Sequence, residues 1–147
     1  DGDLKSRYQK HVEGLDNITI ANSVPRSAVQ SVLARADVLY FAFHKAGRLR
    51  FGQSLNKMID YMLSGKPIIA SYTGFPSMIN EADCGSFVPA EDVGALRKEI
   101  ERYAAMPVQE REAKGVRGRD WVLANRGFDT LAMDYLRYLD IEPPTSR

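Results

Sequence analysis

The sequence predicts an α/β fold in which a parallel sheet is flanked by helices. Short apolar or β-branched segments at 17–22, 37–43, 67–71 and 85–89 alternate with longer segments of helical periodicity. The segments at 37–43 and 67–71 are apolar at nearly every position, which is typical of strands covered by helices on both faces. Alternation of this kind favours strands joined by helical crossovers, and therefore a parallel sheet.

Length and composition limit the possible classes of protein. The 147 residues suffice for one hydrophobic core, and we expect one domain over 1–142 and a flexible tail over 143–147. A net charge of +1 without any basic run argues against nucleic acid as a partner. The single cysteine, Cys84, cannot form an internal disulfide, and we expect it to be a small core residue. No apolar run approaches the roughly 20 residues of a membrane span.

The helix predictions rest on apolar residues spaced three or four positions apart and on the turn residues that bound them. Pro25 stands near the start of one such segment, and Gly14 follows the end of another. The expected helices are 4–13, 24–37, about 54–64, a short helix within 72–84, 91–106, and two more near 108–125 and 128–140. In the helix at 91–106, the face expected to be buried comprises Val93, Leu96, Ile100 and Tyr103.

The helix at 54–64 has an unusual first turn. Its apolar stripe, which should face the sheet, comprises Leu55, Met58, Ile59, Met62 and Leu63. Asn56, Lys57 and Asp60 fall outside that stripe. A lysine is disfavoured in a first turn because the helix dipole is already positive there. A bound anion would remove this conflict.

The loop at 44–53 is the longest loop and the most basic, with Lys45, Arg48 and Arg50. It follows a predicted strand, and in open α/β sheets ligands bind beyond the carboxyl ends of the strands. His44 begins this loop, so we consider it a candidate polar residue of a site.

These features suggest a site for a sugar nucleotide. Free N–H groups at the helix start, together with Lys57, Arg50 and Arg48, would bind a diphosphate. Asp60, one turn further along, could accept hydrogen bonds from two ribose hydroxyls. The residues also allow a purely structural interpretation, in which Ser54 caps the helix, Lys57 is solvated and Asp60 pairs with a lysine or arginine.

Two segments, "FGQSLNKMIDYMLSGKPIIAS" and "TGFPSMINEADCGSFVPAEDVGALRKEI", resemble the donor-binding C-terminal domain of GT-B glycosyltransferases. More narrowly, they resemble the retaining family 4 of bacterial capsule and O-antigen synthesis. Members often carry Ser-Pro-Asn-Lys, an Asp-Tyr-Met segment and Gly-Lys-Pro in this order; here Leu55 replaces the proline. "DGDLKSRY" resembles the end of that domain's Gly-Asp-Gly loop, and "NITIANSVPRSAV" the strand, loop and helix that follow. The resemblance covers essentially the whole chain and implies a Rossmann-like parallel sheet, the C-terminal half of a GT-B fold truncated at its N-terminal side.

The resemblance also implies roles for individual residues. Asp60 stands where an acidic residue binds the ribose hydroxyls, and Gly74 lies in a loop that shapes the donor side of the cleft. The implied nucleobase loop is Asn22, Ser23 and Val24, and the implied diphosphate turn is Gly52, Gln53, Ser54 and Leu55. The late helices cross back onto the N-terminal domain in that family, so apolar surface at Trp121, Tyr135 and Tyr138 is expected to be partly exposed here.

The chain departs from the family pattern in two respects. Many family 4 enzymes have a glutamate eight residues before the ribose-binding acid, where this chain has Gly52. Contact with the donor sugar would then fall to His44 or Gln53. The family's diphosphate-gripping Arg and Lys, and its acceptor-binding N-terminal domain, normally precede the segment present here. We therefore expect a piece of a larger enzyme, inactive by itself.

For the parent enzyme, the resemblance implies retaining transfer of a sugar from a nucleotide sugar of the UDP type, without a metal or other cofactor. The acceptor would be a glycan or lipid-linked molecule of bacterial cell-surface polysaccharide synthesis. The enzyme would be cytoplasmic, and peripheral association with the inner face of the membrane is left open. The sequence shows no metal-ligand spacing, Ser-His-Asp set, P-loop or GxGxxG motif.

Two interpretations compete with a glycosyltransferase. One is a non-catalytic GT-B-like scaffold, which the missing first acid keeps open. The other is a receiver-like interaction module, which would need an acidic cluster at its strand ends to hold Mg²⁺. The predicted strand ends carry Asn22, His44 and Ser71 instead, which argues against the module.

Overall fold

Three parallel strands form the centre of the protein. The computed structural model describes residues 2–51, 56–74 and 77–140, except for the side chains of Arg48 and Arg50. The strands are β1 (Leu39–Ala42), β2 (Ile68–Ser71) and β3 (Gly85–Val88), in the order β1-β2-β3. Both pairs are parallel and in simple register, with Leu39 beside Ile68 and Ile68 beside Gly85. The parallel α/β prediction is confirmed.

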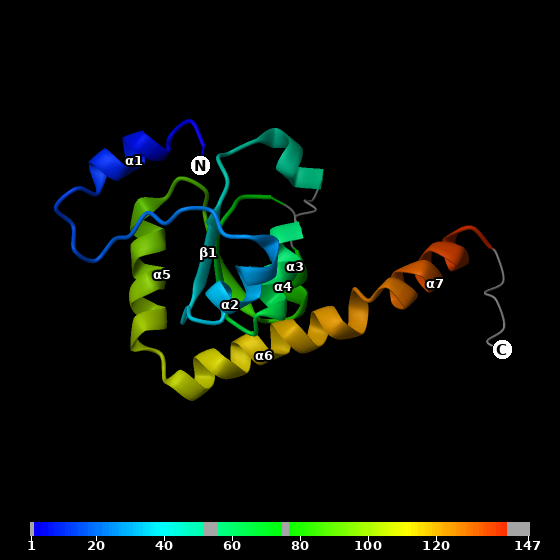
Figure 1. Ribbon diagram of the computed structural model, residues 1–147. Coiled ribbons are helices and arrows are strands. Elements are labelled where there is room, and N and C mark those ends of the chain that lie inside the picture. Colours follow the sequence, from blue (N-terminus) through cyan, green and yellow to red (C-terminus); the bar gives the residue numbers. More distant parts are fainter. Residues whose placement is uncertain (1, 52–55, 75–76, 141–147) are drawn as a thin grey trace.

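Helices cover the two faces of this sheet. They are α1 (Lys5–His11), α2 (Val29–Leu33), α3 (Asn56–Leu63), α4 (Met78–Glu81), α5 (Val93–Ala105), α6 (Val108–Asn125) and α7 (Phe128–Tyr138), with 3-10 turns η1 (Arg26–Ala28) and η2 (Gly47–Phe51). In Figure 1, α5 lies on one side of β1, α3 and α4 lie on the other, α6 runs beneath the sheet, and α7 projects away. The predicted helices are confirmed, although most are shorter than expected. No helix in the described part of the chain is long and apolar enough to cross a membrane.

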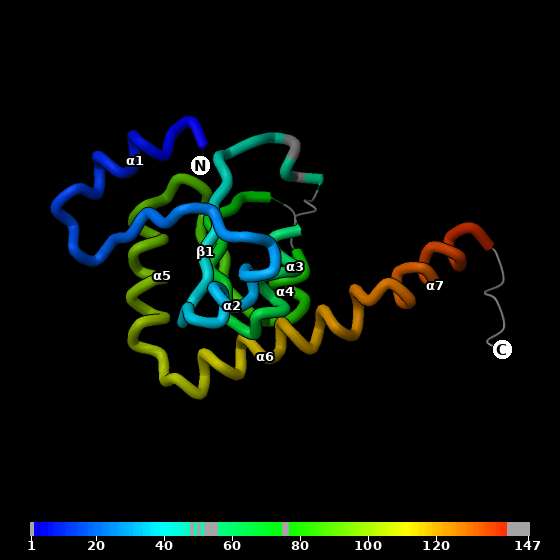
Figure 2. Tube along the Cα trace, in the orientation of Figure 1, coloured from blue at the N-terminus to red at the C-terminus, as the bar shows by residue number. Residues whose placement is uncertain are grey.

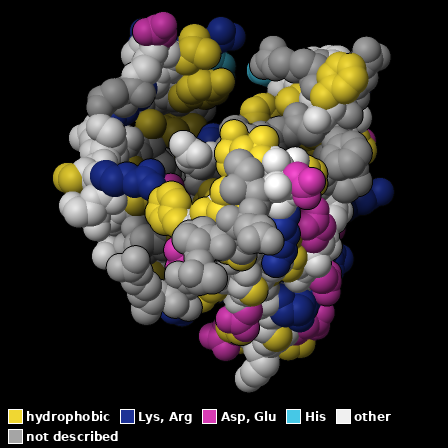
Figure 3. Space-filling view, turned by 90° about the vertical axis from the view of Figure 1, so that its right-hand side faces the viewer, with side chains coloured by type: hydrophobic (Ala, Val, Ile, Leu, Met, Phe, Trp, Pro, Cys, Tyr) yellow, Lys and Arg dark blue, Asp and Glu magenta, His cyan; other side chains and the backbone are white. Residues whose placement is uncertain are grey.

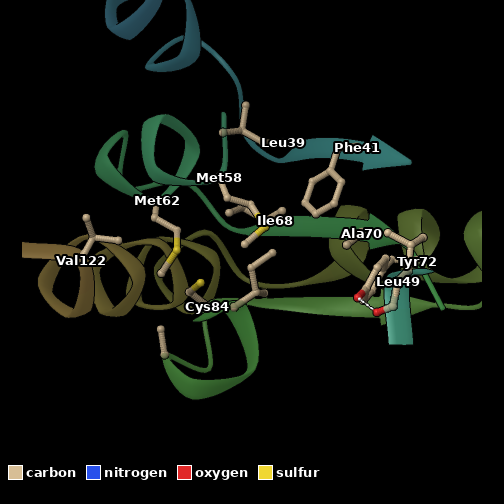
Figure 4. Packing of buried hydrophobic residues seen from close by; sticks show 12 residues of the cluster. Leu39, Phe41, Leu49, Met58, Met62, Ile68, Ala70, Tyr72, Cys84 and Val122 are labelled. Atoms are coloured by element: carbon tan, nitrogen blue, oxygen red, sulfur yellow. Dashed lines mark hydrogen bonds between the residues drawn. The ribbon is translucent and has the colours of Figure 1, made fainter. Parts of the chain in front are cut away.

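The main core lies between α3 and the sheet. Met58 and Met62 of α3 are completely buried, as the apolar stripe predicts. They pack with Leu39 and Phe41 of β1 and with residues of β2 (Figure 4). Cys84 lies in the same cluster, where burial raises the pKa of its thiol to about 11. The expectation of a small, buried core cysteine is confirmed.

Two glycines let α6 approach this core closely. A Cβ on Gly115 would lie 1.9 Å from the carbonyl oxygen of Gly65, and a Cβ on Gly118 would lie 2.8 Å from Cβ of Cys84. Gly65 has a φ of +67°, which allows the chain to turn sharply between α3 and β2. Helix α6 therefore packs backbone against backbone on the turn that leads into the central strand.

The strand predicted at 17–22 is not formed, and this prediction is wrong. Figure 2 traces residues 12–25 as one long irregular segment between α1 and η1. Ile18 donates to the carbonyl oxygen of Leu15 within a turn, not to a neighbouring strand. A strand exists only through pairing with another strand. Within the described residues, this β-branched segment has no strand beside it.

The covering of β1 and the buried face of α5 also differ from the prediction. Tyr40 and Ala42 of β1 are exposed, and Val93 and Ile100 of α5 are 78% and 52% exposed, whereas Tyr103 is buried. Helix α5 packs on β2 and β3, and a cavity of about 640 Å³, lined in part by Tyr40, Ile100 and Tyr103, separates it from β1. One face of β1 is therefore open, and only part of the predicted α5 stripe is covered.

The C-terminal part of the described chain leaves apolar surface exposed, as expected. Tyr135 and Tyr138 on α7 are exposed, while Trp121 on α6 is partly buried against the core. The tail predicted at 143–147 lies outside the described residues.

The glycine contact of α6 can be tested by substitution. We expect Gly115→Ala to lower the free energy of unfolding by about 1–3 kcal/mol, because the new methyl would overlap the backbone at Gly65. This loss should appear despite the gain of about 1 kcal/mol in helix propensity. Urea denaturation measures the difference.

Gly94→Ala is the matched control. Gly94 lies in the first turn of α5, and the nearest atom to a Cβ there is Oδ1 of Asp92 at 3.5 Å. This variant should be neutral or slightly stabilising. Equal effects at the two positions would contradict the packing argument.

Candidate functional site

The carboxyl ends of the three strands lie at one edge of the sheet, where the segments at 43–51, 72–74 and 89–92 begin. Hydrogen bonds join two of these loops. Ser71 Oγ donates to the carbonyl oxygen of Pro89 at 3.3 Å, and the N–H of Ala90 donates to Thr73 Oγ1 at 3.0 Å. The loops after β2 and β3 are thus fixed to each other at the edge where an open α/β sheet binds its ligand.

The basic loop after β1 is anchored near its start by Glu91. The carboxylate of Glu91 accepts the N–H of Lys45 at 3.1 Å and lies 3.3 Å from Nδ1 of His44. An ionised carboxylate can only accept, so Nδ1 is the donor. These contacts lower the pKa of Glu91, the N–H of Lys45 by the largest amount and His44 by the next largest. Glu91 also has a φ of +66°, a conformation that L-residues seldom adopt.

The same loop is anchored in its middle by Tyr72. The buried hydroxyl of Tyr72 donates to the carbonyl oxygen of Leu49 at 2.9 Å. Gly74 passes so close to this contact that a Cβ would lie 2.4 Å from the hydroxyl and 2.5 Å from the Leu49 oxygen. Gly74, predicted to shape the donor side of the cleft, therefore allows the loops after β1 and β2 to touch.

Asp60 forms the most specific polar contact of α3. Arg26 Nη1 lies 3.1 Å from Asp60 Oδ2, and Arg26 Nη2 donates to Asp60 Oδ1 at 3.1 Å. Gln30 Nε2 donates to the backbone oxygen of Asp60 at 3.0 Å. The Asp60 side chain is 16% exposed and that of Arg26 is 78% exposed. The pairing with a lysine or arginine that the sequence left open is present, and Arg26 is the partner.

The predicted diphosphate site is only partly described. Asn56 and Lys57 are exposed at the described start of α3, whose first turn contains no acidic residue. The remaining predicted contacts lie outside the described residues, namely Gly52, Gln53, Ser54, Leu55 and the side chains of Arg48 and Arg50.

The predicted nucleobase loop lies next to Arg26. Asn22, Ser23 and Val24 are exposed, and Lys5 Nζ donates to Asn22 Oδ1. A cavity of about 560 Å³ adjoins this loop, lined by Gly2, Asp3, Leu4, Lys5, Tyr8, Ile20 and Ala21. Pro25 and Arg26 follow the loop directly, so the contact between Arg26 and Asp60 brings the predicted nucleobase and ribose residues together.

His44 does not contact Asp60 or its partners. It pairs with Glu91 near the start of α5, whereas Asp60 contacts η1 and α2. Helices α3 and α5 lie on opposite faces of the sheet (Figure 1). A small pocket of about 200 Å³ beside His44 is lined by Ser71, Glu91 and the first turn of α5, among others.

Three residues of this edge were not anticipated from the sequence: Arg26, Glu91 and Tyr72. Arg26 and Asp60 are 34 positions apart, and Glu91 and Lys45 are 46 apart. No local spacing signals such contacts.

Within the described residues, no group of three or more His, Cys, Asp or Glu side chains could hold a metal ion. In Figure 3, basic and acidic side chains are intermixed on the face that carries α7.

The family comparison covers most of the chain. Residues 1–105 match the sequence model of the family described as "Glycosyl transferases group 1". The chain belongs to the group 1 glycosyltransferases. Comparison with curated protein sequences gives no match.

In fold, this group 1 glycosyltransferase domain is similar to sucrose-phosphate synthase from Thermosynechococcus elongatus. The TM-score is 0.72 at 22% sequence identity, and the match covers 94% of this chain and 34% of the synthase chain. The chain thus spans about a third of the length of that protein. At this identity the likeness shows the fold alone, which is the Rossmann-like half of a GT-B glycosyltransferase.

The anchoring of the basic loop by Glu91 predicts a titration. Because the N–H of Lys45 and the His44 ring favour the ionised carboxylate, the pKa of Glu91 should lie below its ordinary value of 4.5. The contact should be complete above that pKa and be lost as the pH falls through it. The amide shift of Lys45 in ¹H–¹⁵N NMR spectra, followed from neutral to acid pH, reports this midpoint.

Glu91→Gln is the control, since its neutral side chain cannot titrate. The acid transition of the Lys45 amide should disappear in this variant. A wild-type midpoint at or above 4.5 would contradict the assigned hydrogen bond.

Proposed function

We propose that this chain is the donor-binding, C-terminal domain of a retaining glycosyltransferase that uses a nucleotide sugar. The observation that carries the proposal is the placement of Asp60. Its carboxylate lies one turn after the basic start of α3 and is joined through Arg26 to the loop at 22–24. Membership of the group 1 glycosyltransferases supports this assignment.

Separate groups of residues would bind the nucleobase, the ribose and the diphosphate of the donor. Asn22, Ser23 and Val24 would hold the nucleobase, and Asp60 would accept the ribose hydroxyls. Lys57, with Arg50 and residues 52–55, would bind the diphosphate. The dipole of α3 favours an anion at this end. The described first turn of α3 has no carboxylate that would repel one.

The chemical contribution of these groups would be to stabilise the leaving diphosphate. Negative charge develops on the diphosphate as its bond to the sugar breaks, and prearranged N–H groups and cations lower the energy of that state. Gln53 and Gly74 would border the sugar, whereas His44, which faces Glu91 and a separate pocket, would not. We propose a UDP-sugar as donor and no metal or other cofactor.

The wider role would be in bacterial cell-surface polysaccharide synthesis. The acceptor, a glycan or a lipid-linked molecule, would bind to a separate N-terminal domain, so this chain alone would not catalyse transfer. The full-length enzyme would work in the cytoplasm, with peripheral association at the inner face of the membrane.

A second candidate is a non-catalytic GT-B-like scaffold. Two observations favour it. Gly52 stands where the family pattern implied by the resemblance has a glutamate, and the carboxylate of Asp60 is already paired with Arg26. A scaffold would use this pair only to dock η1 on α3.

Nucleotide binding separates the two candidates. We expect the full-length protein to bind UDP or GDP in calorimetric titrations. Asp60→Ala should weaken binding by roughly tenfold or more, because hydrogen bonds to a charged group are lost. Lys57→Ala should weaken it less, by a factor that shrinks as salt is added.

Matched controls are available on other helices. Asp120 on α6 and Lys98 on α5 are exposed, and Asp120→Ala and Lys98→Ala should leave the affinity unchanged. Absence of binding by the wild type for both nucleotides would overturn the donor-site proposal and favour the scaffold.

A further inference from the structure

Both terminal nitrogens of the Arg26 guanidinium contact the carboxylate of Asp60. One nitrogen lies 3.1 Å from Oδ2, and the other donates to Oδ1 at 3.1 Å. A two-pronged contact of this kind fixes the plane of the carboxylate, which a single hydrogen bond or a lysine ammonium would leave free to rotate. The contact with Arg26 therefore favours one orientation of the Asp60 carboxylate.

The contact with Arg26 leaves lone pairs on the Asp60 carboxylate that can accept further hydrogen bonds. A carboxylate offers about four lone-pair positions, two on each oxygen. Arg26 takes at most one on each oxygen, so each oxygen retains at least one. Two neighbouring hydroxyls, each donating one hydrogen bond, match what remains. The 2′ and 3′ hydroxyls of a ribose form such a pair.

The backbone around the pair is also held. Gln30 Nε2 donates to the backbone oxygen of Asp60 at 3.0 Å, so α2 is fastened to α3 beside the carboxylate. Pro25, whose φ is −56°, precedes Arg26 at the start of η1 and restricts the backbone there. Arg26 is thus placed by local structure, directly after the loop at 22–24.

We propose that Arg26 is a positioning residue, which orients the Asp60 carboxylate to receive the ribose hydroxyls of the donor nucleotide. This inference rests on the proposed function of the same site. It assigns to Arg26 the discrimination between ribose and deoxyribose, acting through Asp60 and without direct contact to the phosphates.

The test compares three probes: UDP, 2′-deoxyuridine diphosphate and inorganic pyrophosphate. Their affinities are measured by calorimetry on full-length wild-type protein, Arg26→Ala and Arg26→Lys. If GDP is the nucleotide that binds, it and its 2′-deoxy form replace the uridine pair. Wild type should prefer the ribose form by roughly tenfold, the value of hydrogen bonds to a charged group.

Both Arg26 variants should lose most of this preference while retaining their affinity for pyrophosphate. Arg26→Lys is informative because it keeps the positive charge and removes only the two-pronged geometry. The matched control is Arg97→Ala on α5, since Arg97 is an exposed arginine paired with Glu101. This control should behave as wild type, and circular dichroism melting checks that each variant is folded.

A wild-type ribose preference in Arg26→Ala would overturn the inference and leave the proposed function intact. So would tighter UDP binding, which would make Arg26 a competitor of the ligand, or a loss of pyrophosphate affinity, which would indicate direct phosphate contact. Wild-type protein that binds none of the probes would instead overturn the proposed function, and the inference with it.

Discussion

The burial of β2 is the constraint on which the rest of the structure depends. Every residue from 67 to 72 is buried, because β1 and β3 pair with the two edges of this strand while helices cover its two faces. Parallel pairing brings all three carboxyl ends to one edge. The loops that follow are then close enough for Tyr72 to contact Leu49 and for Glu91 to contact Lys45. The candidate site is a consequence of this shared edge.

Sequence patterns predicted the helices and strands whose local residue pattern is sufficient to identify them. The spacing of Met58 and Met62 fixed the inner face of α3, and the apolar run at 67–71 predicted the central strand. The segment at 17–22 has equally suitable residues, but a strand depends on a partner that composition does not reveal. Periodicity likewise showed which residues of α5 share a face. It could not show that the sheet beneath Ile100 is open.

The residues of the candidate site likewise differ in whether local sequence patterns point to them. Lys57 and Asp60 could be named as candidates because a helix start and the turn after it have local chemical meaning. Arg26 and Glu91 could not, since their partners are distant in sequence and only the fold brings them together. The paired Asp60 also shows that a structural and a ligand-binding interpretation of one residue are compatible. A carboxylate that accepts from an arginine keeps lone pairs for other donors.

The close contact of α6 with Cys84 gives the protein an internal reporter of its own motion. The thiol is fully buried, and its high pKa keeps it in the unreactive protonated form. Gly118 lies directly against it. An alkylating reagent can reach the sulfur only when the packing around it, to which α6 contributes, opens. Because this is the chain's single cysteine, its rate of modification measures how often this part of the core opens, without any label having to be introduced.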